Sequence, residues 1–297
     1  MNTAVLISND MLRAVSGSPT RSGLRVKKCY KRPLPPGIVE NGRIYDEAAL
    51  QAELRAFFSK NKLPRRITLV VDSDSAQFRL QTVPLLPPDK LRRLVRNEFD
   101  SLGATAETHL YDYIVLSPRV EPAGGVILGT ALERSAVQST AKLFAGIGVT
   151  ISVLTLSLPC VIRALRQYPR LSNKSYILTV LDRNNVSSFL FIDGIYRFSN
   201  RSRLYEERDT PAAAVELSRT LSSMVQFNLA QKTGAVIAEA YVSGALPDET
   251  PYFSDISESL GIHIGVLPPP TKAGEDFFRA SRENASDYLY LIGALLG

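Results

Sequence analysis

The sequence predicts a duplicated α/β fold of two lobes with a cleft, and an α+β module inserted in the first lobe. Two strand meanders, each followed by helices and further strands, begin at residues 3 and 176 of the 297-residue chain. Between residues 76 and 149 the chain has its own order of strand, helix, two strands and helix. We therefore expect lobes at 1–172 and 173–297, with the insertion at about 76–149. A cleft between such lobes is a common place for a ligand or partner.

The first meander contains an apolar strand before Ser8, a second strand after Asp10 and an alternating strand at 24–30. A proline-rich break at 33–37 and a tight Asn-Gly turn at 41–42 follow it. This part of the chain therefore predicts three connected strands and then a change of direction.

A helix follows, with Asp46 as its predicted N-cap. Its apolar residues recur with the helical period and predict one buried face. They are Leu50, Leu54, Phe57 and Phe58. A short apolar strand at 67–71 completes the first part of the lobe.

The insertion begins with an alternating strand at 78–83 and a helix that opens at Asp89. The predicted apolar face of this helix consists of Leu91, Leu94, Val95, Phe99 and Leu102. Its opposite, basic face consists of Lys90, Arg92, Arg93 and Arg96. Such a face is more typical of a solvated helix surface than of a contact with an acidic partner or anionic lipid. Strands at 111–116 and 126–132 and a helix at 135–145 complete the module.

The stretch 143–162 has no charged residue and is long enough to span a bilayer. It contains Gly146, Gly148 and Pro159, however, and residues 149–153 alternate with the period of a strand. We expect the end of a helix, a turn and a buried strand here. The N-terminus has no basic segment or long apolar run, so we expect no signal peptide.

The second meander has strands at 176–181, 186–192 and 195–199. A mixed-charge segment that includes Arg201, Arg203 and Glu206–Arg208 is predicted to be an exposed loop. A core helix is then expected from Pro211, through Val215, Leu217, Leu221, Met224, Val225 and Leu229. The last predicted elements are a strand at 240–244, a helix at 253–260, a strand at 262–266 and an apolar helix at 285–296.

Composition excludes several classes of function. The chain has 35 Lys+Arg and 29 Asp+Glu, a formal charge of +6, but no aromatic residues alternate with the basic ones as nucleic-acid binding requires. Its only cysteines are Cys29 and Cys160 and its only histidines His109 and His263, which excludes a Cys/His zinc site and gives no support to a Cys or Ser nucleophile. Scarce cysteine fits a reducing compartment.

The whole pattern resembles the actin/sugar-kinase/Hsp70 superfamily, and within it the PilM family of type IV pilus assembly proteins. The segments that carry the resemblance occur in the family's order at 34–44, 83–91, 96–98, 148–163, 216–221 and 290–295. The resemblance implies an actin-like, ribonuclease-H-like fold, in which three loops bind a nucleotide.

Those three loops depart from the family's pattern. In the first phosphate loop, Leu6 and Ser8 stand where the family has aspartate and glycine, and Arg13 takes the place of lysine. Asp10 could substitute for the aspartate. A side chain in place of glycine prevents the backbone from closing on a phosphate.

The second phosphate loop keeps Asp182, but Asn184 replaces the glycine and Ser188 falls at the threonine position. The nucleoside turn keeps only its first glycine, in Ser243–Gly244. By resemblance, the nucleotide-loop positions of this chain are Ser8, Asn9, Asp10, Arg13, Asp182, Asn184, Ser188, Ser243 and Gly244. Because determinants are altered in all three loops, we expect a degenerate site that has no catalytic residue, metal or cofactor.

The resemblance implies a non-catalytic adaptor that binds the cytoplasmic tail of a PilN-like membrane protein, in a groove of the first lobe near the insertion. Such an adaptor would also meet other pilus platform or motor components, at the inner face of the cytoplasmic membrane and without nucleic acid. Two alternatives stay open. One is a weak ATPase in which Asp10 and Asp182 hold Mg-ATP, and the other is an actin-like scaffold of type II secretion or division. The sequence leaves the oligomeric state open.

Overall fold

The computed structural model describes residues 2–21, 23–117, 124–232, 234–268, 275–281 and 283–297. Contacts divide the chain into two units. Unit 1 comprises Met1–Pro19, Val26–Val161 and Tyr290–Gly297, and unit 2 comprises Thr20–Arg25 and Ile162–Leu289. This division differs from the predicted lobes chiefly at 162–172 and at the C-terminal segment, which returns to unit 1.

The main sheet of unit 1 has the strand order β10-β6-β1-β2-β3. Its strands are β1 (Asn2–Ile7), β2 (Met11–Thr20), β3 (Gly23–Pro33), β6 (Arg66–Val71) and β10 (Thr150–Leu156). β1 and β2 form an antiparallel hairpin, whereas β6 runs parallel to β1 and β10 parallel to β6. The sheet is therefore a meander extended by two parallel strands.

Unit 2 repeats this topology with the order β13-β12-β11-β14-β15. Its strands are β11 (Tyr176–Asp182), β12 (Asn185–Ile192), β13 (Ile195–Arg203), β14 (Glu239–Ser243) and β15 (His263–Val266). The first three strands form an antiparallel meander, and β14 and β15 continue the sheet in parallel. Both sheets therefore place a meander, then two parallel strands, in the same order, which confirms the predicted duplication.

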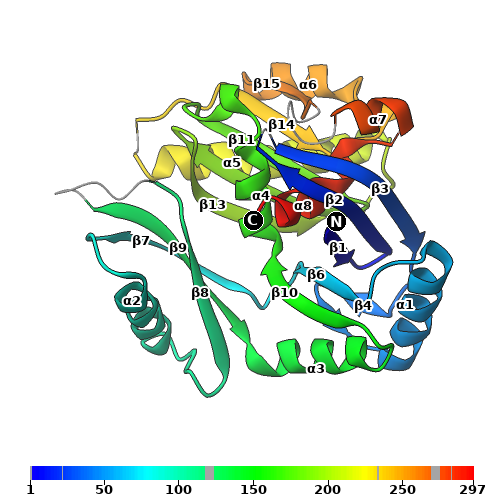
Figure 1. Ribbon diagram of the computed structural model, residues 1–297. Helices are drawn as coiled ribbons and strands as arrows, with labels where there is room; N and C mark the ends of the chain where they lie inside the picture. The colour runs from blue at the N-terminus through cyan, green and yellow to red at the C-terminus, as the bar shows by residue number, and fades with distance from the viewer. Residues whose placement is uncertain (1, 22, 118–123, 233, 269–274, 282) are drawn as a thin grey trace. The chain divides into compact units, whose positions relative to one another are not determined.

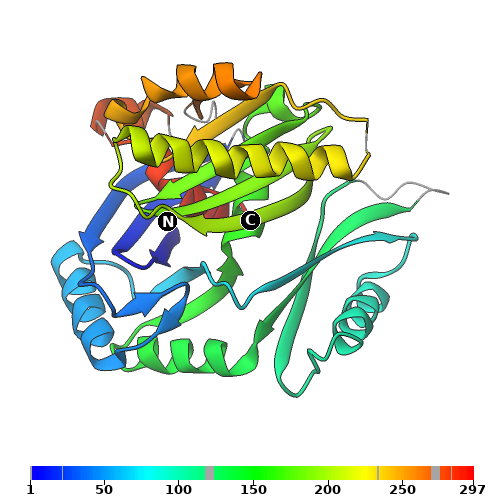
Figure 2. The same ribbon diagram turned by 180° about the vertical axis from the view of Figure 1, so that it is seen from behind.

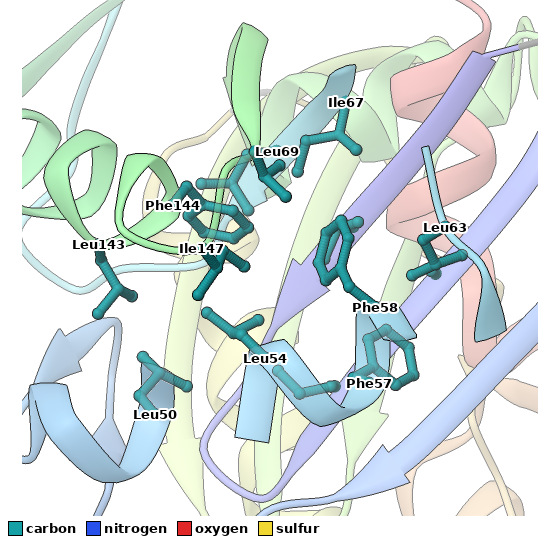
Figure 3. Packing of buried hydrophobic residues seen from close by; sticks show 14 of the residues in the cluster. Leu50, Leu54, Phe57, Phe58, Leu63, Ile67, Leu69, Leu143, Phe144 and Ile147 are labelled. Carbon is teal, nitrogen blue, oxygen red and sulfur yellow. The ribbon is translucent and has the colours of Figure 1, made fainter. Parts of the chain in front are cut away.

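The core of unit 1 forms where α1 (Glu47–Asn61) and α3 (Arg134–Ala145) meet the main sheet. Asp46 caps α1 as predicted, since its Oδ1 accepts the Ala49 N–H at 2.8 Å. Figure 3 shows the predicted face of α1 packed against residues of α3 and β6. The labelled residues of this cluster are Leu50, Leu54, Phe57, Phe58, Leu63, Ile67, Leu69, Leu143, Phe144 and Ile147.

The inserted module has its own sheet, in the order β7-β9-β8, covered on one face by α2 (Figure 1). Its elements are β7 (Gln77–Val83), α2 (Pro88–Asp100), β8 (His109–Val115) and β9 (Gly125–Glu133). Leu91, Val95 and Phe99 are buried as predicted. The prediction was wrong for Leu102, which is 50% exposed because α2 ends at Asp100 and the chain turns away from the helical period.

In unit 2, α5 (Pro211–Ala230) and α6 (Tyr252–Leu260) pack together on the sheet (Figure 2). The buried residues of α5 are Ala213, Leu217, Leu221, Met224 and Asn228. Two residues predicted for the core lie outside this stripe, Val215 at 50% exposed and Leu229 at 67%. A helix that packs on one sheet buries a stripe, so its other apolar residues face solvent.

The uncharged stretch 143–162 contains the end of α3, a turn and the strand β10, as predicted, and then the start of α4 (Ser157–Leu165). The prediction that this strand is buried was wrong, because β10 is the edge strand of its sheet and Val153 is 52% exposed. Among the helices of the described residues, none is sufficiently long and apolar to cross a membrane. The sequence did not predict the short hairpin β4 (Val39–Glu40) and β5 (Arg43–Ile44) or helix α7 (Glu275–Ser281). The predicted closing helix is split into a 3₁₀ turn at Ala285–Tyr288 and α8 (Leu289–Leu295).

Candidate functional site

The structure gathers the predicted nucleotide-loop residues into two groups, one in each unit. Ser8, Asn9 and Asp10 form the tip of the β1–β2 hairpin in unit 1. The Ser8 N–H donates to the Met11 carbonyl at 3.0 Å, which closes the turn on itself. Arg13 is buried on β2, and its guanidinium donates to the Ser8 hydroxyl at 3.4 Å. The Ser8 N–H and the Arg13 side chain thus make contacts within the hairpin.

The tip of this hairpin also holds two neighbouring segments of unit 1. The Asp10 carbonyl accepts the Leu34 N–H at 2.8 Å, where the chain leaves β3. The Asn9 Oδ1 accepts the Asn41 N–H at 2.7 Å, at the turn between β4 and β5. The first loop is therefore an anchoring point for backbone.

The second loop, between β11 and β12 in unit 2, is a tight turn at Arg183–Asn184. Arg183 has a positive φ of 51°, and the Asn184 side chain donates to the Leu204 carbonyl at 3.1 Å. The Leu204 N–H donates back to the Asn184 carbonyl at 2.7 Å. Asn184 thus ties the turn to the segment after β13.

Ser188 lies inside the sheet, fully buried, with its hydroxyl 2.9 Å from that of Thr179 on β11. Unit 1 contains a similar buried pair, in which the hydroxyls of Thr3 and Ser16 lie 2.8 Å apart. Both pairs satisfy polar groups that β-sheet burial would otherwise leave without partners.

The predicted nucleoside turn lies beside the second loop, because β14 runs parallel to β11 and both strands end at the same edge of the sheet. Ser243 is buried and donates to the Ser286 carbonyl at 3.1 Å. Gly244 has a φ of 79°, and a Cβ at this position would come within 2.2 Å of the Leu181 carbonyl oxygen. Close backbone packing therefore requires this glycine whether or not a nucleotide binds.

An ion pair between Arg208 and Glu249 joins these two loops in unit 2. The guanidinium donates to both carboxylate oxygens, to the Gly244 carbonyl at 3.0 Å and to the Arg183 carbonyl at 3.3 Å. The Leu246 N–H adds a bond of 2.7 Å to the carboxylate. The two side chains are only 11% and 10% exposed, so this bidentate pair is shielded from water.

The structure corrects the prediction of an exposed mixed-charge loop in two ways. Arg201 and Arg203 are exposed but lie in the strand β13, and Arg208 is held in this shielded pair. The local sequence predicted solvent exposure because its neighbours Glu206 and Glu207 are charged, and both are indeed exposed. The partner of Arg208 lies 41 positions later in the chain. No local pattern could have identified it.

Beside this pair, a cavity between α5 and α6 holds about 20 Å³. It is lined by Leu181, Leu204, Asp209, Thr210, Ala213, Ala214, Leu217, Glu249, Tyr252, Phe253 and Ile256. One water molecule occupies a space of about this size, whereas ligand pockets measure about 300–1,000 Å³. The cavity therefore has no room for a nucleobase.

Unit 1 contains a larger groove of about 320 Å³, which lies beside the β4–β5 hairpin, the segment after β6, and α3. Its apolar and small lining residues are Gly42, Ile44, Val71, Leu132, Ala136, Val137 and Leu154. Its hydroxyl groups come from Ser73, Ser75, Ser135, Ser139 and Thr140, and its charged groups from Arg43, Glu47 and Glu133. The lining thus mixes apolar side chains with hydroxyl and charged groups, which suits an extended peptide that offers both side chains and backbone.

The basic face of α2 is exposed, as predicted, but part of its charge is paired within the helix. Arg92 donates to Asp89 at 2.9 Å and Arg96 to Asp100 at 3.3 Å. Asp100 also accepts the hydroxyl of Tyr111, and burial together with this bond raises the pKa of Tyr111 to about 12. Because exposed i,i+3 and i,i+4 pairs are typical of a solvated surface, this face gives little support to a lipid contact.

In the part of the chain that the structure describes, no three His, Cys, Asp or Glu side chains gather as metal ligands would. His263 is exposed on β15 and alternates with the buried Ile262 and Ile264. Cys160 is buried and Cys29 is half-buried, and neither forms a disulfide.

No family model matches the chain, and no curated protein matches it in sequence. Solved structures do share its fold. A chain of a PilM–PilN type IV pilus biogenesis complex is 17% identical, with a TM-score of 0.79 over 99% of this chain and 97% of that one. This likeness establishes the fold and confirms, at that level, the predicted resemblance to PilM.

Two further structures support the same fold. A Bacteroides thetaiotaomicron protein described as having an actin-like ATPase fold is 10% identical, with a TM-score of 0.53 over 90% of each chain. The ethanolamine utilization protein EutJ from Carboxydothermus hydrogenoformans is 10% identical, with a TM-score of 0.51 over 100% of this chain and 89% of that one. The chain thus has the actin-like fold that the sequence predicted.

Proposed function

We propose that this chain is a non-catalytic, actin-like adaptor of a type IV pilus assembly platform. Its partner would be the cytoplasmic tail of a PilN-like membrane protein, bound at the inner face of the cytoplasmic membrane. The observation that carries the proposal is the likeness to the PilM–PilN complex over almost the whole of both chains.

The groove of unit 1 is the proposed site for that tail. It lies between the main sheet and the inserted module, where the resemblance to PilM leads us to expect a peptide. Apolar pockets at Ile44, Val137 and Leu154 would take side chains of an extended segment, and the serine hydroxyls would bind its backbone. Such a peptide could reach the groove, because Ser135 and Ser139 in its lining are exposed to solvent.

The loops of the nucleotide site support the non-catalytic part of the proposal. In unit 2, Arg208 binds carbonyls of both loops, and the cavity beside it is too small for a base. In unit 1, Asn9 binds backbone of the β4–β5 turn. Since these side chains serve internal contacts, the fold needs no nucleotide to hold the loops together.

The adaptor proposal is tested by binding of a synthetic peptide with the N-terminal sequence of the organism's PilN-like protein, followed by fluorescence polarisation. Ser139→Arg places a long charged side chain in the groove, and we expect it to weaken binding by at least about tenfold. Gln138→Arg is the matched control, because Gln138 is exposed on the same helix and does not line the groove. Equal binding by both variants would exclude this groove as the site.

The alternative of a weak ATPase is separated by calorimetry with Mg-ATP. We expect no heat of binding from the wild-type chain. A low-micromolar affinity, lost in Asp10→Asn and Asp182→Asn, would instead support a functional nucleotide site.

A further inference from the structure

We propose that Asn9 is a positioning residue for the groove of unit 1, although it does not line it. It holds the β4–β5 turn, which forms one wall of the groove, in a fixed place. The contact between Asn9 and the β4–β5 turn does not depend on any ligand, whereas the effect of Asn9 on peptide binding rests on the proposed function.

Asn9 connects two turns that are distant in sequence. The Asn9 Oδ1 accepts the Asn41 N–H at 2.7 Å, and the Asn9 amide nitrogen lies 3.5 Å from the Asn41 Oδ1. The β1–β2 hairpin that carries Asn9 belongs to the main sheet and is closed by its own turn. Asn9 therefore presents its side chain from a rigid support.

The β4–β5 hairpin is weak by itself. It contains only two strand pairs, Val39 with Ile44 and Glu40 with Arg43. Its turn is formed by Asn41 and Gly42, both at positive φ, 51° and 81°. An isolated hairpin of this length is not stable in water, so its position depends on contacts from other elements.

The turn of the β4–β5 hairpin also contacts the segment after β6, which lines the groove. The Asn41 carbonyl accepts the Asp74 N–H at 3.2 Å, and Gly42 packs so closely that a Cβ there would lie 2.6 Å from the Ser73 Cβ. Arg43 adds a long contact of 4.0 Å to Asp74. The turn is therefore held between Asn9 on one side and the segment after β6 on the other.

The same residues then line the groove. Gly42, Arg43 and Ile44 contribute from the hairpin, and Ser73 and Ser75 from the segment after β6. A shift of the turn would move the hairpin side of this wall relative to α3. Asn9 thus fixes the width of the groove by a protein contact, at a loop position which in nucleotide-binding relatives would serve a phosphate.

The test compares Asn9→Ala and Asn9→Asp, read by amide hydrogen exchange and by peptide binding. Asn9→Asp keeps the oxygen that accepts the Asn41 N–H, so it is the conservative rescue. Asn184→Ala is the matched control, because it removes the bonds of another turn asparagine in unit 2. The hairpin tip retains its bond from Leu34 to Asp10 in every variant, which favours retention of the fold.

We expect Asn9→Ala to accelerate exchange at Asn41 and Asp74 about fivefold, the effect of one lost neutral hydrogen bond, and to weaken peptide binding by a similar factor. Asn9→Asp and Asn184→Ala should stay within about twofold of wild type in both measurements. Unchanged exchange at Asn41 in Asn9→Ala would overturn the inference. Faster exchange with unchanged affinity would also overturn it, since the wall would then not govern binding.

A wild-type chain that binds no peptide would remove the proposed function but leave the exchange result decisive for the positioning role. In that case, acceleration that extends from Asn41 to Arg43 and Ile44 supports the role of Asn9, and acceleration confined to Asn41 overturns it.

Discussion

The two units have the same order of strands but use the turn of their first hairpin differently. In unit 1, the turn at Ser8–Met11 reaches outward and holds the β4–β5 hairpin at the wall of an open groove. In unit 2, the turn at Asp182–Asn185 is bound by Arg208 and Asn184 into a closed structure with a cavity of about 20 Å³. A duplicated sheet therefore does not fix where a binding site lies. The segments inserted around each turn decide it.

The insertions differ because the parallel strands are separated differently in the two units. Between β6 and β10, unit 1 contains the β7-β9-β8 sheet, α2 and α3. Between β14 and β15, unit 2 contains only a 3₁₀ turn and α6. The longer connection provides α3 and the end of β9 as groove walls, whereas the short one packs α6 directly on α5.

The greatest loss of stability is expected at the ion pair of unit 2. Arg208→Ala leaves the Glu249 carboxylate buried without its cation, which we expect to lower the free energy of unfolding by about 3–5 kcal/mol. The matched change in unit 1 is Arg32→Ala, which removes a pair at 2.6 Å whose side chains are 33% and 24% exposed. We expect that change to lower the free energy of unfolding by about 1 kcal/mol or less. Urea denaturation measures both, and equal losses would contradict a special role for the buried pair.

The next effect distinguishes close packing from nucleotide contact at Gly244. Gly244→Ala combines a positive φ with a clash against the Leu181 carbonyl, so we expect the free energy of unfolding to fall by about 2–4 kcal/mol. Gly37→Ala is the control, because Gly37 has a similar φ of 81° but no atom lies within 4 Å of the added Cβ. It should cost about 1–2 kcal/mol. Thermal unfolding without nucleotide gives the answer, and a Gly244 variant as stable as the control would contradict the packing argument.

The smallest effect is a pH dependence in unit 2. Hydrogen bonds from Lys174 at 2.5 Å and from the Tyr241 hydroxyl at 2.6 Å hold the pKa of Glu239 below its usual 4.5. Because the folded pKa is lowered, this carboxylate stabilises the fold above pH 4.5, and the contribution is lost as the pH falls through the folded value.

The measurement is the free energy of unfolding of wild type and Glu239→Gln at pH 7, 5 and 3. We expect Glu239→Gln to be slightly less stable at pH 7 and 5, and the difference to become smaller at pH 3. The same deficit at all three pH values would show that the loss is one of packing rather than of charge.

Positive charge lies on an edge strand of each main sheet. β3 carries exposed Lys27, Lys28 and Lys31, and β13 carries exposed Arg197, Arg201 and Arg203. Charged side chains on an edge strand oppose pairing with a second chain. Part of the +6 net charge can thus be understood as protection of the sheet edges, with no polyanion required.

Much of the fold could be predicted because it depends on local patterns. Alternation predicted the meanders, and the period of Leu50, Leu54 and Phe57 predicted the buried face of α1. The predictions failed for apolar residues that lie past the end of a helix or outside the face that the helix buries. Leu102 follows the last turn of α2, and Leu229 lies on the solvent side of α5. Periodicity gives no information about where a partner element stops covering a helix.

Local sequence patterns were enough to predict the duplicated α/β architecture, the cap at Asp46 and the inserted module. Only the tertiary structure decided what the three loops of the nucleotide site contact. Asn9 meets Asn41, 32 positions away, and Arg208 meets Glu249, 41 positions away. Strands and helices arise from neighbours in sequence, so composition and period indicate them. A groove wall and a buried ion pair arise where distant segments approach, and only folding brings those segments together.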